Sequence, residues 1–194
     1  SNGPAMSSPI VKSFAALRPK PEVAAQVASV PYDVVNRPEA KALVEGKPLS
    51  FRVKLLVVDT NEGCDVGDVN KDGVPDVVAG RYWFAGPDFT PRPLRAIAEF
   101  GKDYSASNGD FLYDVDGDGW LDVLSIPFME SQLCWYRNPG RQGLKFGKLW
   151  QRHLLVDTLQ GSNEAAWLRD MDGDGTPEFI VNSWNVGRPM SYWK

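Results

Sequence analysis

Three short stretches of the chain carry acidic side chains at one repeated spacing. The second reads DVDGDGWLD, from Asp114 to Asp122, and holds four aspartates within nine positions. Like charges this close repel one another unless a cation binds between them. The loops at residues 68–76 and 170–178 repeat the pattern D-x-[DN]-x-D-G-x-x-[DE]. The sequence therefore predicts one kind of cation site, built three times.

The residue types at these positions favour calcium. Oxygen atoms at positions 1, 3, 5 and 9, with the main-chain carbonyl at position 7, can surround one ion, and glycine at position 6 permits the sharp turn. Many flexible oxygen ligands suit Ca²⁺ better than Zn²⁺ or Mg²⁺. We expect up to three structural Ca²⁺ ions. The predicted ligands are Asp68, Asn70, Asp72, Val74 and Asp76; Asp114, Asp116, Asp118, Trp120 and Asp122; and Asp170, Asp172, Asp174, Thr176 and Glu178.

The loop pattern has two other interpretations. An EF-hand needs a Glu at position 12 and flanking helices, but position 12 is Ala79, Ser125 or Val181, and the flanks are rich in β-branched residues. Hairpin turns without metal are the second alternative, because Asp, Asn and Gly are common turn residues. Three copies at one spacing favour metal binding. Since Asn70 replaces a carboxylate, we expect the first loop to be the weakest site.

Short β-rich runs surround the loops and must position them. The loops open at Asp68, Asp114 and Asp170, so several strands recur with a period of roughly 50 residues, which is typical of β-propeller blades. Residues 93–101 are predicted to add an outer strand between the first two units. The strand-length runs lie at 55–59, 75–80, 121–125, 153–157 and 178–182.

Residues from about 53 to 194 resemble the FG-GAP/VCBS repeat family of integrin-type β-propellers. The resemblance rests on VGDVNKDGVPDVVAG, YDVDGDGWLDV and LRDMDGDGTPEFIVNSW. It implies an all-β fold, a partial β-propeller of about three blades, with calcium bound at positions 1, 3, 5 and 9 of each loop. It also implies a secreted, extracellular protein with a binding, adhesion or scaffold role against a protein or carbohydrate ligand.

Closed propellers need at least four blades, and the third unit breaks off inside its aromatic strand. We therefore expect residues 53–194 to be a C-terminally truncated part of a longer array. Such an open array can associate with itself through exposed blade edges.

The first fifty residues have a different composition. Residues 1–9 are interpreted as a tag remnant or a disordered lead, and residues 10–52 as a mostly helical or irregular segment of different origin. Asn36, Pro38 and Gly46 mark one short helix.

The motifs LRPKPE, PYDVV and GKPLSF resemble the start of an uncharacterised family related to free-serine kinases of the ParB/sulfiredoxin-like class. That family is usually not exported, so the two halves imply different compartments. A fusion near Phe51 is one interpretation, and a genuine lead-in to the first blade is the other.

Composition and charge restrict the partners. The net charge is −4, and hydrophobic residues make up 43% of the chain, which fits a globular protein without a nucleic-acid footprint. No apolar run approaches the roughly 20 residues of a membrane helix, and we expect no signal peptide in this sequence. Cys64 and Cys134 fit either two free thiols or a single bridge.

Catalytic machinery is not visible in the sequence, so enzymatic activity stays open, with a non-catalytic role favoured. The single histidine, His153, is predicted on a strand without a nearby nucleophile. The alternative function is an enzyme. It would be either a serine-kinase-like activity linked to the N-terminal family or a carbohydrate-active propeller.

A second set of residues suggests a ligand face at the other end of the strands. Asn61 and Asn163 precede their loops by six or seven residues, and a strand of this length spans about 20 Å. Trp83, Trp135 and Trp193 recur once per unit and are predicted to pack between blades. An Asn-led turn is the alternative interpretation. The candidate ligand contacts are Asn61, Glu62, Asn163, Glu164, Trp120 and Trp184.

Overall fold

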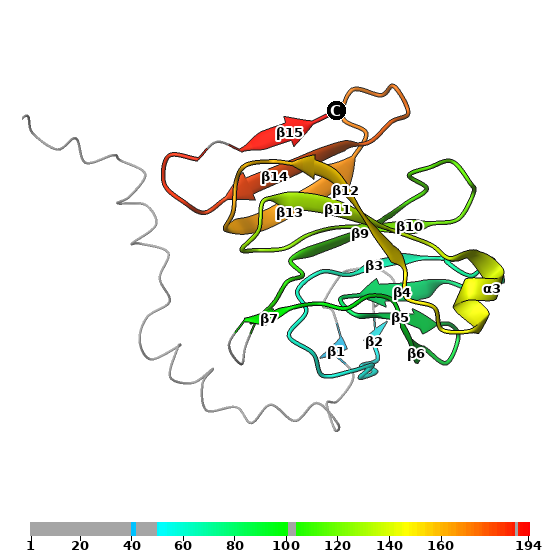
Figure 1. Ribbon diagram of the computed structural model, residues 1–194. Helices are drawn as coiled ribbons and strands as arrows, with labels where there is room; N and C mark the ends of the chain where they lie inside the picture. Colours follow the sequence, from blue (N-terminus) through cyan, green and yellow to red (C-terminus); the bar gives the residue numbers. More distant parts are fainter. Residues whose placement is uncertain (1–39, 42–49, 101–103, 189) are drawn as a thin grey trace, which may run out of the picture. The chain divides into compact units, whose positions relative to one another are not determined.

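The computed structural model describes residues 40–41, 50–100, 104–188 and 190–194 (Figure 1). The chain divides into two compact units, Ser1–Leu55 and Leu56–Lys194. The described part of the first unit contains one antiparallel ladder, between β1 (Ala40–Lys41) and β2 (Ser50–Phe51).

The helix predicted after Asn36 is therefore wrong at Ala40 and Lys41. These two residues pair with β2, and such tertiary pairing overrides a local helical preference. The rest of that segment and residues 1–9 lie outside the described residues.

Three antiparallel sheets make up most of the second unit, as Figure 1 shows. The first sheet holds β3 (Asp65–Gly67), β4 (Asp76–Ala79), β5 (Tyr82–Ala85) and β6 (Thr90–Pro93). The second sheet holds β9 (Gly109–Tyr113), β10 (Asp122–Ile126), β11 (Gln132–Arg137) and β12 (Gln151–Asp157). The third sheet holds β13 (Asn163–Arg169), β14 (Glu178–Ser183) and β15 (Ser191–Trp193).

Two smaller elements accompany the sheets. β7 (Glu99–Phe100) pairs with β8 (Tyr104–Ser105), and the helix α3 (Gly140–Lys145) connects β11 to β12. Within the described ranges α3 is the one helix, so the fold is nearly all β, as predicted. None of the described helices is long and apolar enough to cross a membrane.

The three sheets share one local plan. In each, strands run in chain order, and an acidic loop connects the first strand to the second. The strand pairs that close the loops are equivalent, because each joins the last residue of the first strand to position 9 of the loop. These pairs are Gly67 with Asp76, Tyr113 with Asp122, and Arg169 with Glu178.

Most of the predicted strands are present, one is absent and one is misplaced. β4, β10, β12 and β14 confirm the runs at 75–80, 121–125, 153–157 and 178–182. Residues 55–59 form no strand, because they pair with no sheet in the described part of the chain, and Val58 is 87% exposed there.

The outer strand predicted at 93–101 is misplaced. The fourth strand of the first sheet is β6, and the Leu94 and Arg95 N–H groups that follow it donate to the Arg81 carbonyl instead of extending the ladder. Pro91 and Pro93 suit this edge position, because proline has no N–H to donate.

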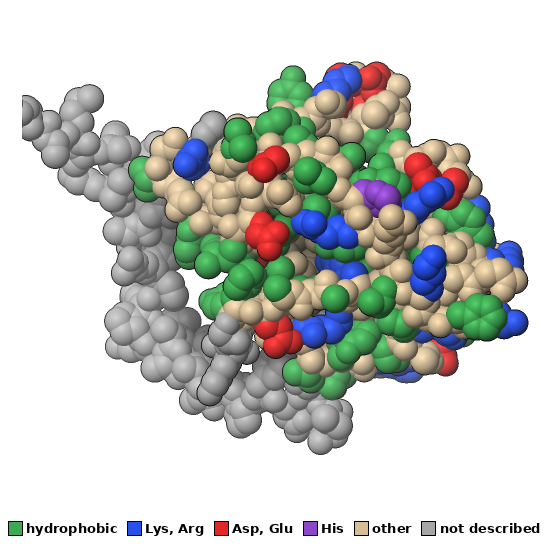
Figure 2. Space-filling model, in the orientation of Figure 1, with side chains coloured by type: hydrophobic (Ala, Val, Ile, Leu, Met, Phe, Trp, Pro, Cys, Tyr) green, Lys and Arg blue, Asp and Glu red, His purple; other side chains and the backbone are tan. Residues whose placement is uncertain are grey.

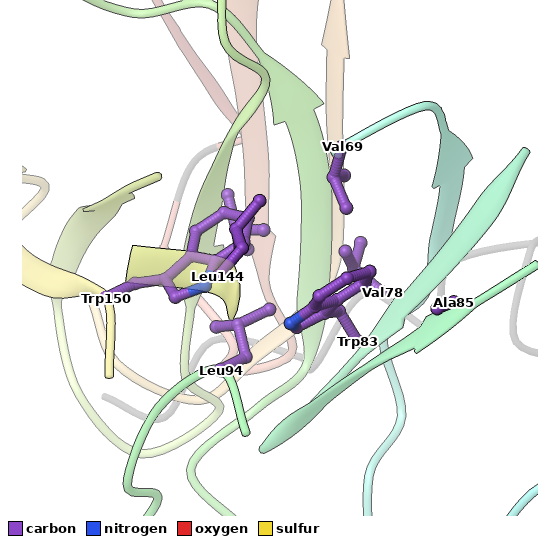
Figure 3. Close-up of a cluster of buried hydrophobic side chains, with 8 residues drawn as sticks. Val69, Val78, Trp83, Ala85, Leu94, Leu144 and Trp150 are labelled. Atoms are coloured by element: carbon purple, nitrogen blue, oxygen red, sulfur yellow. The ribbon is translucent and has the colours of Figure 1, made fainter. Parts of the chain in front are cut away.

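Two hydrophobic clusters hold the sheets together. Figure 3 shows Val78 and Trp83 on one side of the first cluster, Leu144 and Trp150 on the other, and Leu94 between them. This cluster joins the first sheet to the second sheet and its helix. The second cluster joins the second and third sheets through Leu124, Ile126, Leu133, Phe179 and Val181.

The aromatic repeat lies at these junctions. Trp83 is buried in the first cluster, and Trp135 and Trp193 pack against the second. The packing role predicted for one tryptophan per unit is therefore confirmed. Both cysteines are free, Cys64 exposed and Cys134 buried, so they form no bridge.

Candidate metal centres

The backbone of all three acidic loops takes the same path. Glycine at position 6 has a positive φ in every loop, at +84° for Gly73, +83° for Gly119 and +92° for Gly175. Residues with a side chain rarely adopt this left-handed backbone conformation, so glycine is the suitable residue there. The turn that the spacing predicts is thus built in each sheet.

The carboxylate at position 1 of each loop accepts a hydrogen bond from the backbone of position 6. The position 6 N–H donates to Oδ2 of Asp68 at 2.8 Å, of Asp114 at 2.8 Å and of Asp170 at 2.9 Å. This bond holds one oxygen of the carboxylate towards the centre of the loop.

The carboxylates at position 5 are placed by the main chain two residues further on. The N–H groups of position 7 donate to them at 2.8–2.9 Å, from Val74 to Asp72, from Trp120 to Asp118 and from Thr176 to Asp174. This bond lowers the pKa of Asp118, and it adds to the effect of Lys194 in lowering the pKa of Asp174. Both groups therefore favour the charged form that binds a cation.

The carboxylate at position 9 lies at the base of each loop and is buried. Asp76 and Asp122 are 0% exposed and Glu178 is 1% exposed. Burial raises the pKa of Asp76 and raises that of Asp122 to about 6, although backbone N–H groups act in the opposite direction. A buried carboxylate is unfavourable without a compensating charge, so each loop base is suited to a cation.

In the second and third loops the acidic groups converge. One oxygen each of Asp114, Asp116 and Asp122 lies within 4.8 Å of the others. The same holds for the corresponding third-loop residues, Asp170, Asp172 and Glu178. Among the described residues the first loop forms no such acidic triple, and its position 3 is Asn70.

Each loop also contains one buried oxygen that accepts no hydrogen bond. These atoms are Asn70 Oδ1, Asp114 Oδ1 and Glu178 Oε1. Of the three, Glu178 Oε1 has an ion-pair partner, Lys194 Nζ at 3.4 Å. Unpartnered buried oxygens are rare, because losing water without a replacement costs about 1–3 kcal/mol. The set of carboxylate, amide and main-chain oxygens thus fits a hard divalent cation such as Ca²⁺.

Two basic side chains that the sequence analysis did not anticipate face these loops. Arg137 Nε lies 2.7 Å from Asp116 Oδ2, and its Nη2 lies 3.1 Å from Asp118 Oδ2. Lys194 contacts Asp172 and lies 2.7 Å from Asp174 Oδ2. The signal was present in CWYR and SYWK, where a basic residue follows each aromatic strand run.

The candidate ligand residues divide between the two ends of the strands. Glu62, Glu164 and Trp184 line one cavity of about 380 Å³, together with aromatic side chains from other segments. β13 begins at Asn163, whose partner is Ser183, whereas its acidic loop lies beyond Arg169. The cavity is therefore at the strand ends opposite the acidic loops.

The other three candidates do not line this cavity. Asn163 is fully buried, and its amide donates to the Pro127 and Glu130 carbonyls. Asn61 accepts a hydrogen bond from the Ser107 hydroxyl at 2.7 Å. Trp120 belongs to the second acidic loop, where the ammonium group of Lys71 lies 4.4 Å from its ring centroid. The six residues therefore do not form a single site.

Comparison with protein families gives two matches. Residues 114–181 match the family described as FG-GAP-like repeat, and residues 11–68 match the family described as Protein of unknown function (DUF1015). Both resemblances inferred from the sequence are thereby confirmed. Searches of curated proteins and of solved structures find no match to this chain.

The FG-GAP-like match spans the second and third acidic loops and the strands between them. A repeat of this kind indicates a β-propeller-type binding module. The second match extends past Phe51, where a junction was predicted, through β3 to Asp68, the first position of the first acidic loop. The division into residues 10–52 and 53–194 stays a prediction.

Proposed function

We propose that residues 53–194 form a partial β-propeller of about three blades, which acts as a binding, adhesion or scaffold segment of a longer secreted protein. The blades are the three sheets, each with an acidic loop between its first two strands. In this proposal the loops bind up to three structural Ca²⁺ ions through positions 1, 3, 5, 7 and 9.

The buried carboxylate at position 9 is the observation that carries the calcium proposal. Asp122 and Glu178 lie below the surface, and each has two further carboxylates of its loop within 4.8 Å. A bound divalent cation would supply the charge that compensates this cluster. The loop residues would orient the oxygens, and the closing strand pairs would transmit the restraint to the sheets.

A thermal melt of metal-free protein, with Ca²⁺ or with chelator, tests this function. At a Ca²⁺ concentration 100 times Kd, each site adds about 2.7 kcal/mol, or roughly 5–10 °C in Tm for a domain of this size. Asp116→Asn and Asp172→Asn should each remove part of the shift. Glu130→Gln, an exposed carboxylate outside the loops, should leave it intact. Identical melting with and without calcium would contradict the proposal.

The match at residues 11–68 leaves open a second candidate, the serine-kinase-like activity that the resemblance of the N-terminal motifs implies. A carbohydrate-active propeller is the other enzymatic alternative. Incubating the full chain with ATP, Mg²⁺ and free serine tests the kinase activity directly. Removing residues 1–51 should abolish phosphoserine formation if this candidate is right. A truncated chain that binds calcium and loses no activity would exclude it.

A further inference from the structure

The cavity at the strand ends opposite the acidic loops has an unusual set of lining groups. Its volume of about 380 Å³ is within the range of small-ligand sites, about 300–1,000 Å³. Two carboxylates, Glu62 and Glu164, line it, and no Lys or Arg among the described residues does so. The described lining of the cavity therefore carries negative charge and no basic side chain.

Aromatic rings make up much of the remaining wall. Phe100, Tyr104, Phe128 and Trp184 come from three different segments. Phe128 and Trp184 meet edge to face, with ring centroids 5.5 Å apart and planes at 85°. Trp184 is 66% exposed and Tyr104 is 61% exposed, so both rings keep open surface that a ligand can cover.

Hydrogen bonds fix the segments that carry these rings. Asn163 donates from its backbone N–H to the Phe128 carbonyl at 2.9 Å, and its amide donates to the Pro127 and Glu130 carbonyls on either side. The Trp184 N–H donates to the Ser162 carbonyl at 3.0 Å. The walls near Phe128 and Trp184 are therefore anchored to β13 and not only packed against it.

A similar set of bonds fixes Glu62. Its N–H donates to the Ser107 carbonyl at 3.3 Å, and Ser105 donates from its hydroxyl to the Thr60 carbonyl at 3.2 Å. Asn61 accepts from the Ser107 hydroxyl. Asn61 and Asn163, which the sequence analysis proposed as ligand contacts, thus act as positioning residues for the two carboxylates beside them.

The two carboxylates are available to a ligand. Ion pairs in the described ranges involve neither Glu62 nor Glu164, and both residues are exposed. On the face drawn in Figure 2, hydrophobic side chains lie among acidic and basic side chains, which adjoin one another in several places. A site that combines aromatic faces with unpaired carboxylates favours an organic cation, because the ring faces and the carboxylates both attract positive charge.

We propose that this cavity binds a quaternary ammonium group. Such a group is cationic and has an apolar surface, so it gains from the aromatic walls and from the carboxylates without needing hydrogen-bond acceptors for N–H groups. The inference deepens the proposed binding role and rests on it. The group can come from a choline headgroup or from a trimethylated lysine, which share this chemistry.

Calorimetric titration of the full chain with choline in calcium-containing buffer tests the site. The neutral isostere 3,3-dimethylbutan-1-ol serves as the matched ligand and should bind about tenfold more weakly or not at all. Trp184→Ala and the double variant Glu62→Gln/Glu164→Gln should each weaken choline binding about tenfold or more. Trp167→Ala, an equally exposed tryptophan at 64%, and Glu130→Gln should bind choline like the unmodified chain.

Two further titrations identify the source of the group. Binding of a trimethyllysine peptide but not of phosphatidylcholine vesicles assigns a protein ligand, and the reverse assigns a lipid. Absence of choline binding, equal binding of the isostere, or full binding by Trp184→Ala would overturn the site. A calcium-dependent Tm measured on the same samples separates this failure from a failure of the calcium proposal.

Discussion

The first acidic loop and the two later loops follow one backbone plan but differ in charge. Position 3 is Asn70 in the first loop and an aspartate in the second and third. Position 4 is Lys71 in the first loop and glycine in the others. The first loop therefore has one carboxylate fewer and one basic side chain more.

The strand that pairs beside each loop base also differs in charge between the sheets. Arg137 and Lys194 follow Tyr136 and Trp193, the partners of Val123 and Phe179. At the equivalent place in the first sheet, Ala85 follows Phe84, the partner of Val77. The second and third loops thus have a basic residue at this strand position, whereas the first loop has Ala85 there.

This difference explains how the second and third loops can hold several carboxylates close together before a cation binds. Arg137 and Lys194 offset part of the repulsion in the second and third loops, and an incoming cation must displace them. Ion pairs between exposed side chains are weak, whereas the number of charged ligands sets calcium affinity over several orders of magnitude. The extra carboxylate should therefore outweigh the competing base, and the first loop should remain the weakest site.

The largest effect is expected at the buried loop base. Asp122→Ala leaves the Val115 and Asn138 N–H groups without their acceptor, which should reduce the free energy of unfolding by about 2–4 kcal/mol in metal-free protein. Asp76→Ala removes equivalent bonds from Val69 and Gly86 and should cost a similar amount. Urea denaturation with calcium should then separate the two, with the larger additional loss for Asp122→Ala.

Exchanging the position 3 residues should reverse the order of the sites. Asn70→Asp is expected to raise calcium affinity at the first loop roughly tenfold, and Asp116→Asn to lower it at the second loop by a similar factor. Terbium luminescence can follow the second loop, because Trp120 lies within it and can sensitise the bound ion. An unchanged titration of Asp116→Asn would show that position 3 does not bind the ion.

Removing the competing base should have a smaller effect. Arg137→Met frees Asp116 and Asp118 from their ion pairs, so calcium affinity at the second loop should rise roughly two- to fivefold. Arg141→Met, a nearby exposed arginine with no ion pair in the described part of the chain, is the matched control. Weaker calcium binding by Arg137→Met would mean that Arg137 supports the site instead of competing for it.

The smallest effect concerns the backbone at position 4. Lys71 has a φ of +58°, a conformation that costs roughly 1–2 kcal/mol for residues other than glycine. Lys71→Gly removes that cost and also the contact with the Trp120 ring, worth about 0.5–1 kcal/mol at an exposed site. Stability should rise by about 1 kcal/mol or less in thermal melts. A clear loss of stability would show that the ring contact dominates.

The loops and most strands could be predicted because their signals are local. The acidic spacing fixes the turn, the positive φ at Gly119 follows from the glycine at position 6, and branched residues mark β10 and β14. The strand predictions were wrong where strand formation depends on pairing with a neighbouring strand. Residues 55–59 have strand composition but pair with no strand in the described ranges. Pro91 and Pro93 lie in β6, although proline is depleted in strands.

The candidate sites show the same division. The predicted calcium ligands of each loop lie within nine residues of one another, so one aligned motif finds them. The cavity joins Glu62, Phe100, Phe128, Glu164 and Trp184, which are far apart in the chain. Glu62, Glu164 and Trp184 could be predicted as ligand contacts, because they lie at the ends of predicted strands. Phe100 and Phe128 could not, because no repeat or spacing connects them to the others.

Counting bound calcium tests the central claim most directly. Metal-free chain is dialysed to equilibrium against a series of Ca²⁺ concentrations, and the metal retained per chain is measured by elemental analysis. We expect two ions to bind first, at the second and third loops, and a third at higher concentration. At the Ca²⁺ concentration that fills only the two stronger sites, Asp116→Asn and Asp172→Asn should each retain one ion fewer. Retention of less than one ion per chain at millimolar Ca²⁺ would contradict the account.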